Sequence, residues 1–265
     1  MRPSFIDNYR LPAIFAFLLY LAAFAPPDAW AGPPFVTDDP EPVEFRHWEI
    51  YIASQWAHDR QGTSGTLPHV EVNYGVIPDV QLHIITPIAY SAPHGGPAQY
   101  GLGDMELGIK YRFIHEDDKG WIPQIGAFPL VDLPTGDSSR GRGEGHASIF
   151  LPIWMQKSSG QWTTYGGGGY WYHPGEGNRS YWFVGWLLQR DFSKTLTLGA
   201  EIFDTSPKAK GEGEETGFNI GGLLNLSEEH HILFSAGHDI RGPNAFLAYL
   251  AFQWTFGPKE EKEAE

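Results

Sequence analysis

Residues 101–113, Gly-Leu-Gly-Asp-Met-Glu-Leu-Gly-Ile-Lys-Tyr-Arg-Phe, decide the fold, because polar and apolar side chains alternate without interruption from Asp104 to Phe113. Successive side chains leave opposite faces of a strand, so this period of two predicts a β-strand. One face is wholly apolar, and the other carries two acids and two bases. Such a strand suits a soluble sandwich, whose apolar face meets a second sheet, or an outer-membrane barrel, whose apolar face meets lipid.

The composition favours a single all-β domain. The chain has 265 residues, 32 glycines and 15% aromatic residues, as expected for a barrel of many short strands. A formal net charge of -14 argues against nucleic acid as a partner, because nucleic-acid binding requires a basic surface. The chain contains no cysteine, so it has no disulfide framework from which a redox compartment could be inferred.

The N-terminus has the pattern of a secretory signal peptide. Arg2 and Arg10 precede a short apolar run, residues 11–25, and Ala29-Trp30-Ala31 offers a cleavage site. A membrane anchor is the alternative, but the run is short and prolines follow it. We therefore expect a signal peptide over residues 1–31. Residues 32–44 are rich in proline and predict an extended N-terminal arm.

The rest of the chain predicts about twelve antiparallel strands in an up-and-down transmembrane β-barrel over residues 45–256. The connections alternate in length, longer after odd-numbered strands and tight after even-numbered ones, as in a chain that crosses a bilayer repeatedly. A Greek-key sandwich gives no reason for this alternation. We expect residues 59–66 to form a polar loop and residues 115–120 a tight turn. The last strand has a continuous apolar face that ends at Phe256, and residues 257–265 form a charged tail.

Polar side chains on the inward faces of the predicted strands form the candidate site. A cross-strand ion-pair network that fills the barrel and a pore lining that selects solutes both account for them, and the two can coexist. The predicted lumen-lining residues are His69, Glu71, Asn73, Asp104, Glu106, Lys110, Arg112, Glu201, Asn219 and Asn225.

No metal, cofactor or catalytic set is predicted. His230 and His231 are adjacent on a strand and face opposite ways, so they cannot chelate one ion from one face. The four glycines at 166–169 lack the Lys-Ser/Thr and the helix of a phosphate cradle, and more simply allow strand curvature or make room for a neighbouring side chain. A lipid-modifying enzyme would need a nucleophile and a base at the lipid interface. His146 and Ser148, with Asp132 and Asp137 before them, are close in sequence, but there is no Gly-x-Ser-x-Gly motif and the sequence predicts no enzyme.

Several motifs resemble one known family across the mature chain. They are His47-Trp48-Glu49, Asn73-Tyr74-Gly75, Asp79-Val80-Gln81-Leu82, Gly103–Phe113 and Leu133-Pro134-Thr135-Gly136. They resemble the outer-membrane family named for the meta-cleavage pathway of phenol degradation. The resemblance implies an outer-membrane barrel that helps aromatic or other hydrophobic compounds across the envelope, with no catalytic residues to carry over.

The sequence therefore predicts an outer-membrane channel of a Gram-negative bacterium, with passive uptake of small compounds through a narrow, partly plugged lumen. Its expected partners are outer-membrane lipid, a small-molecule solute and the barrel-assembly machinery. A structural or adhesive barrel that transports nothing is the main alternative. A lipid-modifying enzyme and a soluble periplasmic barrel holding a hydrophobic ligand are weaker ones.

Overall fold

The computed structural model describes residues 33–117 and 120–258. The predicted signal peptide (1–31) and residues 259–265 of the predicted tail lie outside the described residues. Within the described part, the elements are β1 (Trp48–His58), β2 (Gly62–Ile77), β3 (Val80–Pro93), β4 (Gln99–Leu102), β5 (Met105–Ile114), β6 (Gln124–Ala127), β7 (Leu130–Leu133), the 3₁₀ helix η1 (Ser138–Arg140), β8 (Ser148–Ser159), β9 (Trp162–Tyr172), β10 (Tyr181–Asp191), β11 (Leu196–Thr205), β12 (Glu215–Asn225), β13 (His230–Arg241) and β14 (Phe246–Phe256).

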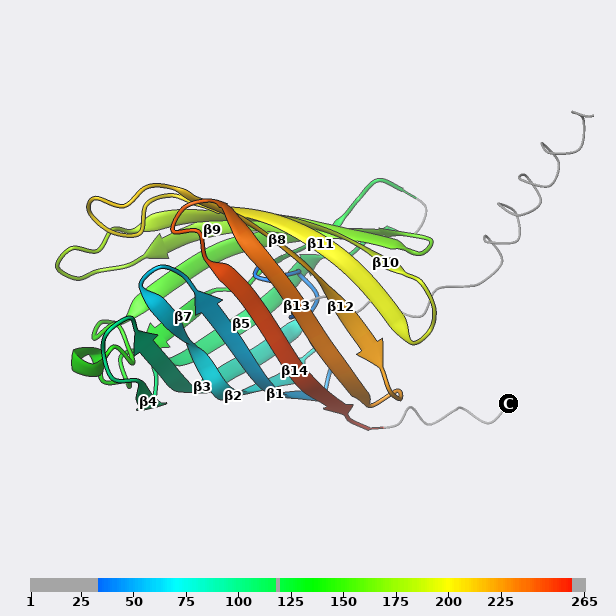
Figure 1. Cartoon of the computed structure of the whole chain (residues 1–265). Helices are drawn as coiled ribbons and strands as arrows, with labels where there is room; N and C mark the ends of the chain where they lie inside the picture. Colours follow the sequence, from blue (N-terminus) through cyan, green and yellow to red (C-terminus); the bar gives the residue numbers. More distant parts are fainter. Residues whose placement is uncertain (1–32, 118–119, 259–265) are drawn as a thin grey trace, which may run out of the picture.

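These strands form a closed, antiparallel, twelve-stranded barrel (Figure 1). Each strand pairs with its neighbours in sequence, and β1 pairs with β14 to close the ring. β4 and β5 together make the fourth crossing, because both pair with β3, and β6 and β7 together make the fifth, because both pair with β5 and β8. The predicted all-β, up-and-down fold with about twelve strands is confirmed.

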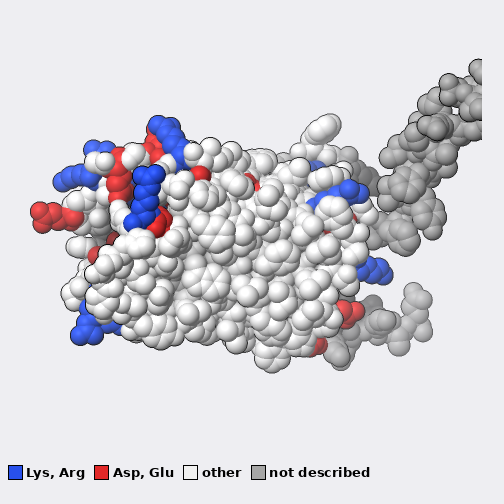
Figure 2. Space-filling view, in the orientation of Figure 1, with Lys and Arg blue, Asp and Glu red and all other residues white. Residues whose placement is uncertain are grey.

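The strands alternate between a lipid-suited exterior and a packed interior. In β10, Trp182 and Val184 are 63% and 59% exposed, whereas Leu187 of the same strand is fully buried. In β5, Leu107 and Ile109 also point outward. On the face seen in Figure 2, a broad uncharged surface covers the middle of the barrel, and most Lys, Arg, Asp and Glu gather towards its two ends. This distribution is the one that a bilayer requires of a transmembrane barrel. Within the described residues, no helix is long and apolar enough to cross a membrane.

Two predicted connections differ from the structure. Residues 62–66 belong to β2, where Thr66 pairs with Gln55 and Thr63 with His58, so only residues 59–61 connect β1 to β2. Residues 62–66 lack alternating apolar side chains. Their polar composition therefore wrongly predicted a loop. The predicted tight turn after β5 is longer and runs from residue 115 to 123.

The glycine run at 166–169 makes room for neighbouring side chains, which is one of the two interpretations that the sequence allowed. A Cβ on Gly166 would lie 2.6 Å from the ring of Trp186, and one on Gly168 would lie 2.8 Å from a Val184 methyl group. Trp186 crosses this bare stretch of β9 and donates its ring N–H to Thr164 Oγ1 at 2.9 Å. The glycines therefore allow two bulky outer side chains to lie flat on the barrel wall.

Candidate functional site

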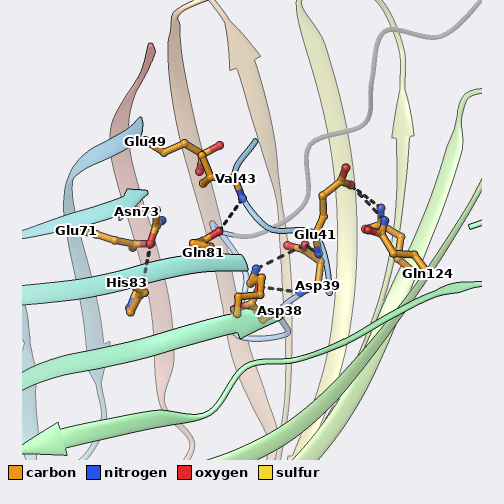
Figure 3. A network of polar contacts seen from close by, with 12 residues as sticks. Asp38, Asp39, Glu41, Val43, Glu49, Glu71, Asn73, Gln81, His83 and Gln124 are labelled. Atoms are coloured by element: carbon orange, nitrogen blue, oxygen red, sulfur yellow. Dashed lines mark hydrogen bonds and ion pairs between the residues drawn. The ribbon is translucent and has the colours of Figure 1, made fainter. Parts of the chain in front are cut away.

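The N-terminal arm, described from residue 33 to 44, lies inside the barrel and is bonded to several parts of its wall. Pro34 O accepts a hydrogen bond from Ser235 Oγ of β13 at 2.6 Å. The backbone N–H of Thr37 donates to Glu201 Oε2 of β11 at 2.8 Å. On β3, Gln81 Oε1 accepts a hydrogen bond from the Val43 N–H at 2.9 Å (Figure 3). Because β11 and β13 lie far around the ring from β3, the arm crosses the lumen.

Charged groups hold the middle of the arm. Lys110 Nζ of β5 lies 3.0 Å from Asp38 Oδ1 and 3.6 Å from Asp39 Oδ1. Glu41 Oε2 accepts a hydrogen bond from Gln156 Nε2 at 3.1 Å, and its other oxygen lies 3.7 Å from the Arg112 guanidinium. Opposite charges removed from water attract strongly. The arm is therefore fixed to the wall by ion pairs as well as by backbone hydrogen bonds.

The arm forms part of the barrel's core. Thr37, Asp39 and Pro40 are among the largest fully buried side chains of the described residues. Asp39 Oδ1 accepts a hydrogen bond from the Glu41 N–H at 2.6 Å, whereas Oδ2 has no hydrogen-bond partner. Burial raises the pKa of the Asp39 carboxyl well above its ordinary value, because the charged form loses its hydration. The arm thus narrows the lumen with tightly packed chain rather than with a loose tail.

One wall of the lumen carries a polar network from β1, β2, β3 and β5. Glu71 Oε1 accepts from Asn73 Nδ2 at 2.8 Å, and Asn73 Oδ1 lies 2.7 Å from His83 Nδ1 (Figure 3). The other imidazole nitrogen of His83 lies 2.9 Å from Glu106 Oε1. Glu49 accepts a hydrogen bond from the Tyr51 hydroxyl at 2.8 Å. The barrel interior therefore holds several carboxyl groups, of which Glu71 and Glu106 both lie near His83.

The facing wall is aromatic. Its rings stack and meet edge to face, as with Phe150, whose centroid lies 4.7 Å from that of Trp171. Phe128, between β6 and β7, joins the two walls, because its ring lies 5.2 Å from that of His83. The cluster, called here the aromatic wall, consists of Phe128, Phe150, Trp154, Phe183 and Phe203, with Leu130, Trp171 and Leu247 packed against it.

A cavity of about 1280 Å³ lies between the arm and the polar wall. Glu49, Glu71 and Glu106 line its polar side, and Phe128 and Leu130 line its apolar side. The cavity extends to the connection after β5, where Trp121 is almost fully exposed. A small molecule inside it would contact both polar and aromatic groups.

The structure places most of the predicted lumen residues in the interior. His69, Glu71, Asn73, Lys110, Glu201 and Asn219 are buried there, and Glu106 and Arg112 are half-buried. Glu201 and Asn219 are directly bonded, since Asn219 Nδ2 donates to Glu201 Oε1 at 2.6 Å. These residues do not form one cluster, because Glu201 and Asn219 lie on β11 and β12, away from the network of β2, β3 and β5.

Asp104 and Asn225 instead lie at the two ends of the barrel. Asp104 accepts backbone hydrogen bonds from Gly136 at 2.8 Å and Glu144 at 2.7 Å, and so anchors the long loop that contains η1. Asn225 Nδ2 donates to Lys194 O at 3.0 Å in the turns at the opposite end. Both stabilise connections.

Sequence reasoning missed two parts of the site. The acidic residues of the arm, Asp38, Asp39 and Glu41, gave no periodic pattern, although their partners Lys110 and Arg112 were selected. The inward aromatic residues were missed because the predicted lumen lining contained only polar side chains. Phe183 lies between the exposed Trp182 and Val184, so alternation alone cannot mark its face as interior.

The residues considered for catalysis do not assemble. Ser148 Oγ donates to Asp132 Oδ2 at 2.9 Å, whereas His146 Nδ1 lies 3.1 Å from the backbone oxygen of Glu144. No hydrogen bond joins Ser148 to a histidine within the described residues. The nucleophile and base that a hydrolase would need at this position are therefore separate.

Comparison with known proteins identifies the family of this chain. The model of the family described as "Putative MetA-pathway of phenol degradation" matches residues 56–256. The chain belongs to this family. A search of curated proteins finds no match to the sequence.

Solved structures share the fold of this family member. The COG4313 outer membrane channel from Pseudomonas putida F1 is similar with a TM-score of 0.67 at 15% identity, over 88% of this chain and 100% of that one. The KdgM porin in complex with disordered oligogalacturonate gives 0.55 at 8% identity, over 78% and 99% of the two chains. The NanC porin gives 0.56 at 6% identity, over 77% and 98%. With its closed ring and uncharged outer surface, the protein has the architecture of an outer-membrane β-barrel, as predicted.

Proposed function

We propose that the barrel is a passive uptake channel for small compounds that have an apolar or aromatic part. The observation that carries this function is the lumen itself, where the aromatic wall and the polar wall meet along one cavity at Phe128. Apolar solutes partition onto aromatic surface, whereas a wholly polar lumen favours hydrophilic solutes. The solute moves down its concentration gradient, with no bound cofactor and no chemical step.

The arm sets the width of the passage. Its docked position narrows the lumen, so larger solutes pass when the arm shifts. Outer-membrane lipid surrounds the uncharged outer surface, and the barrel-assembly machinery inserts the mature chain. The separation of Ser148 from His146 supports a function without catalysis.

The tightly held arm also favours a second candidate, a barrel that transports nothing and acts structurally or through its loops. Buried anchors such as Thr37 and Glu201 are what a permanently closed barrel would need.

Planar-bilayer recording of the mature chain, residues 32–265, distinguishes the two candidates. A channel gives discrete conductance steps, and the step size increases when the anchor is removed in a Glu201→Ala variant. Folded, heat-modifiable protein that gives no steps in either form would exclude the open channel and leave the structural role.

A further inference from the structure

The cavity beside the arm has a strong excess of acidic side chains. Seven carboxyl side chains line it, against three from Lys and Arg. Each of the three bases already has an acidic partner, as in the pairs Lys157–Glu116 at 2.9 Å, Arg112–Asp79 at 2.7 Å and Lys110–Asp38 at 3.0 Å. The bases that line the cavity are therefore already paired, two of them with acids of the same lining. Within the described residues, Glu49, Glu71 and Glu106 form no ion pair with Lys or Arg, although Lys110 attracts Glu49 electrostatically.

One imidazole serves two of these carboxylates. His83 Nδ1 lies 3.6 Å from Glu71 Oε1, and His83 Nε2 lies 2.9 Å from Glu106 Oε1. Asp132 of β7, which pairs with Glu106 across the sheet, adds another carboxyl group. A single His83 side chain can supply at most one positive charge to this group. The polar wall thus remains rich in acceptors and negative charge after all of its internal contacts are made.

On another side of the cavity, a side-chain amide oxygen lacks a hydrogen-bond donor. Gln156 of β8 is 3% exposed and lines the cavity, and its Oε1 has no hydrogen-bond partner. Its Nε2 donates to Glu41, which fixes the orientation of the amide. A buried acceptor without a donor costs free energy. A ligand with N–H donors would satisfy it.

The apolar side of the cavity suits a cation as well. Phe128 lines the cavity, and the Lys110 ammonium lies 4.9 Å from the centre of its ring. That contact is a cation–π interaction within the protein. Leu130, which packs against the aromatic wall, enlarges the apolar surface beside Phe128. An apolar body can therefore lie on this side while its charged head faces Glu71 and Glu106.

We propose that the cavity binds a primary ammonium group carried on an aromatic or aliphatic body, so that hydrophobic amines are the preferred solutes of the barrel. This inference rests on the proposed uptake function and names its substrate class. Carboxylate groups that line a narrow pore concentrate cations and repel anions. The ammonium head also supplies the N–H donors that the cavity lacks, and the body buries apolar surface on Phe128 and Leu130.

Isothermal titration of the detergent-folded mature barrel tests the proposal with three matched probes: 2-phenylethylammonium, the neutral 2-phenylethanol and the anionic phenylacetate. The ammonium is expected to bind at least tenfold more tightly than the alcohol, and phenylacetate most weakly. Equal or weaker binding of the ammonium overturns the proposal. This comparison uses the parent chain, so it does not depend on whether a variant folds.

A double variant, Glu71→Gln with Glu106→Gln, locates the site. The near-isosteric amides keep hydrogen bonding but remove both charges, and the preference for ammonium over alcohol is expected to fall to less than threefold. Glu214→Gln, in an exposed loop, is the matched control and keeps the parent preference. An unchanged preference in a heat-modifiable double variant would overturn the assignment to this cavity.

Bilayer recording separates this inference from the function on which it rests. Ammonium-selective binding without conductance would exclude uptake and leave the binding site. Conductance without any preference for the ammonium would leave the channel and exclude the amine site.

Discussion

Glu201 of β11 holds Thr37 of the N-terminal arm across the barrel interior, with the Thr37 N–H donating to Oε2 at 2.8 Å and the Val36 N–H donating to Oε1 at 2.9 Å. Asn219 donates to the same carboxylate. One side chain in the barrel wall thus satisfies two consecutive backbone donors of the arm. Because the strands of the wall are fixed by the closed sheet, this carboxylate sets the position of the arm.

Glu201→Ala is expected to loosen the arm while leaving the barrel folded. Hydrogen bonds to a charged group each contribute about 1.5–3 kcal/mol, and the variant removes two of them from the arm. The single-channel conductance should therefore rise, with more frequent transitions between levels. Glu214→Ala, in an exposed loop, serves as the control and should match the parent. Parent-like conductance in Glu201→Ala would show that this carboxylate does not hold the arm.

Leu107→Arg tests the lipid-facing side of β5. Leu107 points outward and pairs with Ile84 of β3 and Val131 of β7. A cation at the middle of the bilayer costs about 2–4 kcal/mol, so the variant should assemble poorly or unfold at lower temperature in a heat-modifiability gel. Leu107→Ile is the matched control. If the Arg variant resists heat like the parent, Leu107 does not face lipid.

The barrel could be predicted from the sequence because its strands carry a local, periodic signal. Leu107 and Ile109 alternate with Glu106 and Lys110, and a closed ring is the way in which such strands satisfy their backbone groups in a membrane. The N-terminal arm has no such signal. Its prolines predict an extended chain, but its position depends on residues such as Glu201, which lies 164 positions away from Thr37 in the sequence.

The interruptions of the fourth and fifth crossings were also beyond the sequence reasoning. Pro129 has no N–H to donate to the sheet, and its own carbonyl accepts a hydrogen bond from Ile109 N at 3.2 Å. The preceding residue, Phe128, turns its ring into the lumen and is 4% exposed. A proline near the end of an apolar run is compatible with a short strand, so the sequence does not reveal this interruption. The inward position of Phe128 depends on how the segment around Pro129 pairs with β5 and β8.

The pH should change how firmly the arm is held. Burial raises the pKa of the Asp39 carboxyl in the docked arm, and that of Glu41 in the same direction. The docked arm therefore binds protons more tightly than the free arm, so docking is favoured below the ordinary aspartate value of 3.8 and weakens as the pH rises through the docked-state pKa. Lys110 and Asp38 also face this carboxyl.

Conductance recorded between pH 4.5 and pH 8.5 is expected to increase with pH in the parent. Asp39→Asn, which cannot ionise, should show a smaller increase. Asp117→Asn, in the connection after β5, is the control. A parent conductance that stays constant or falls over this range would contradict the prediction.

Lys110 is the buried cation on which the acidic middle of the arm depends. Its ammonium lies 3.0 Å from Asp38 and 3.6 Å from Asp39, and the side chain itself is buried. Removing one partner of a buried ion pair costs about 3–5 kcal/mol, because the remaining charge is left without compensation. Lys110→Met should therefore expel the arm from the lumen. Limited proteolysis measures this directly, as cleavage within residues 33–44 of the folded barrel.

The reciprocal change provides the decisive comparison for Lys110. Neutralising both acids in a triple variant, Lys110→Met with Asp38→Asn and Asp39→Asn, removes the uncompensated charge and should restore protection of the arm to near the parent level. A loss of packing around Lys110 would instead leave the arm equally cleavable in the single and triple variants. Rescue would therefore identify charge compensation, rather than the shape of the lysine side chain, as the interaction that keeps the acidic arm inside the barrel.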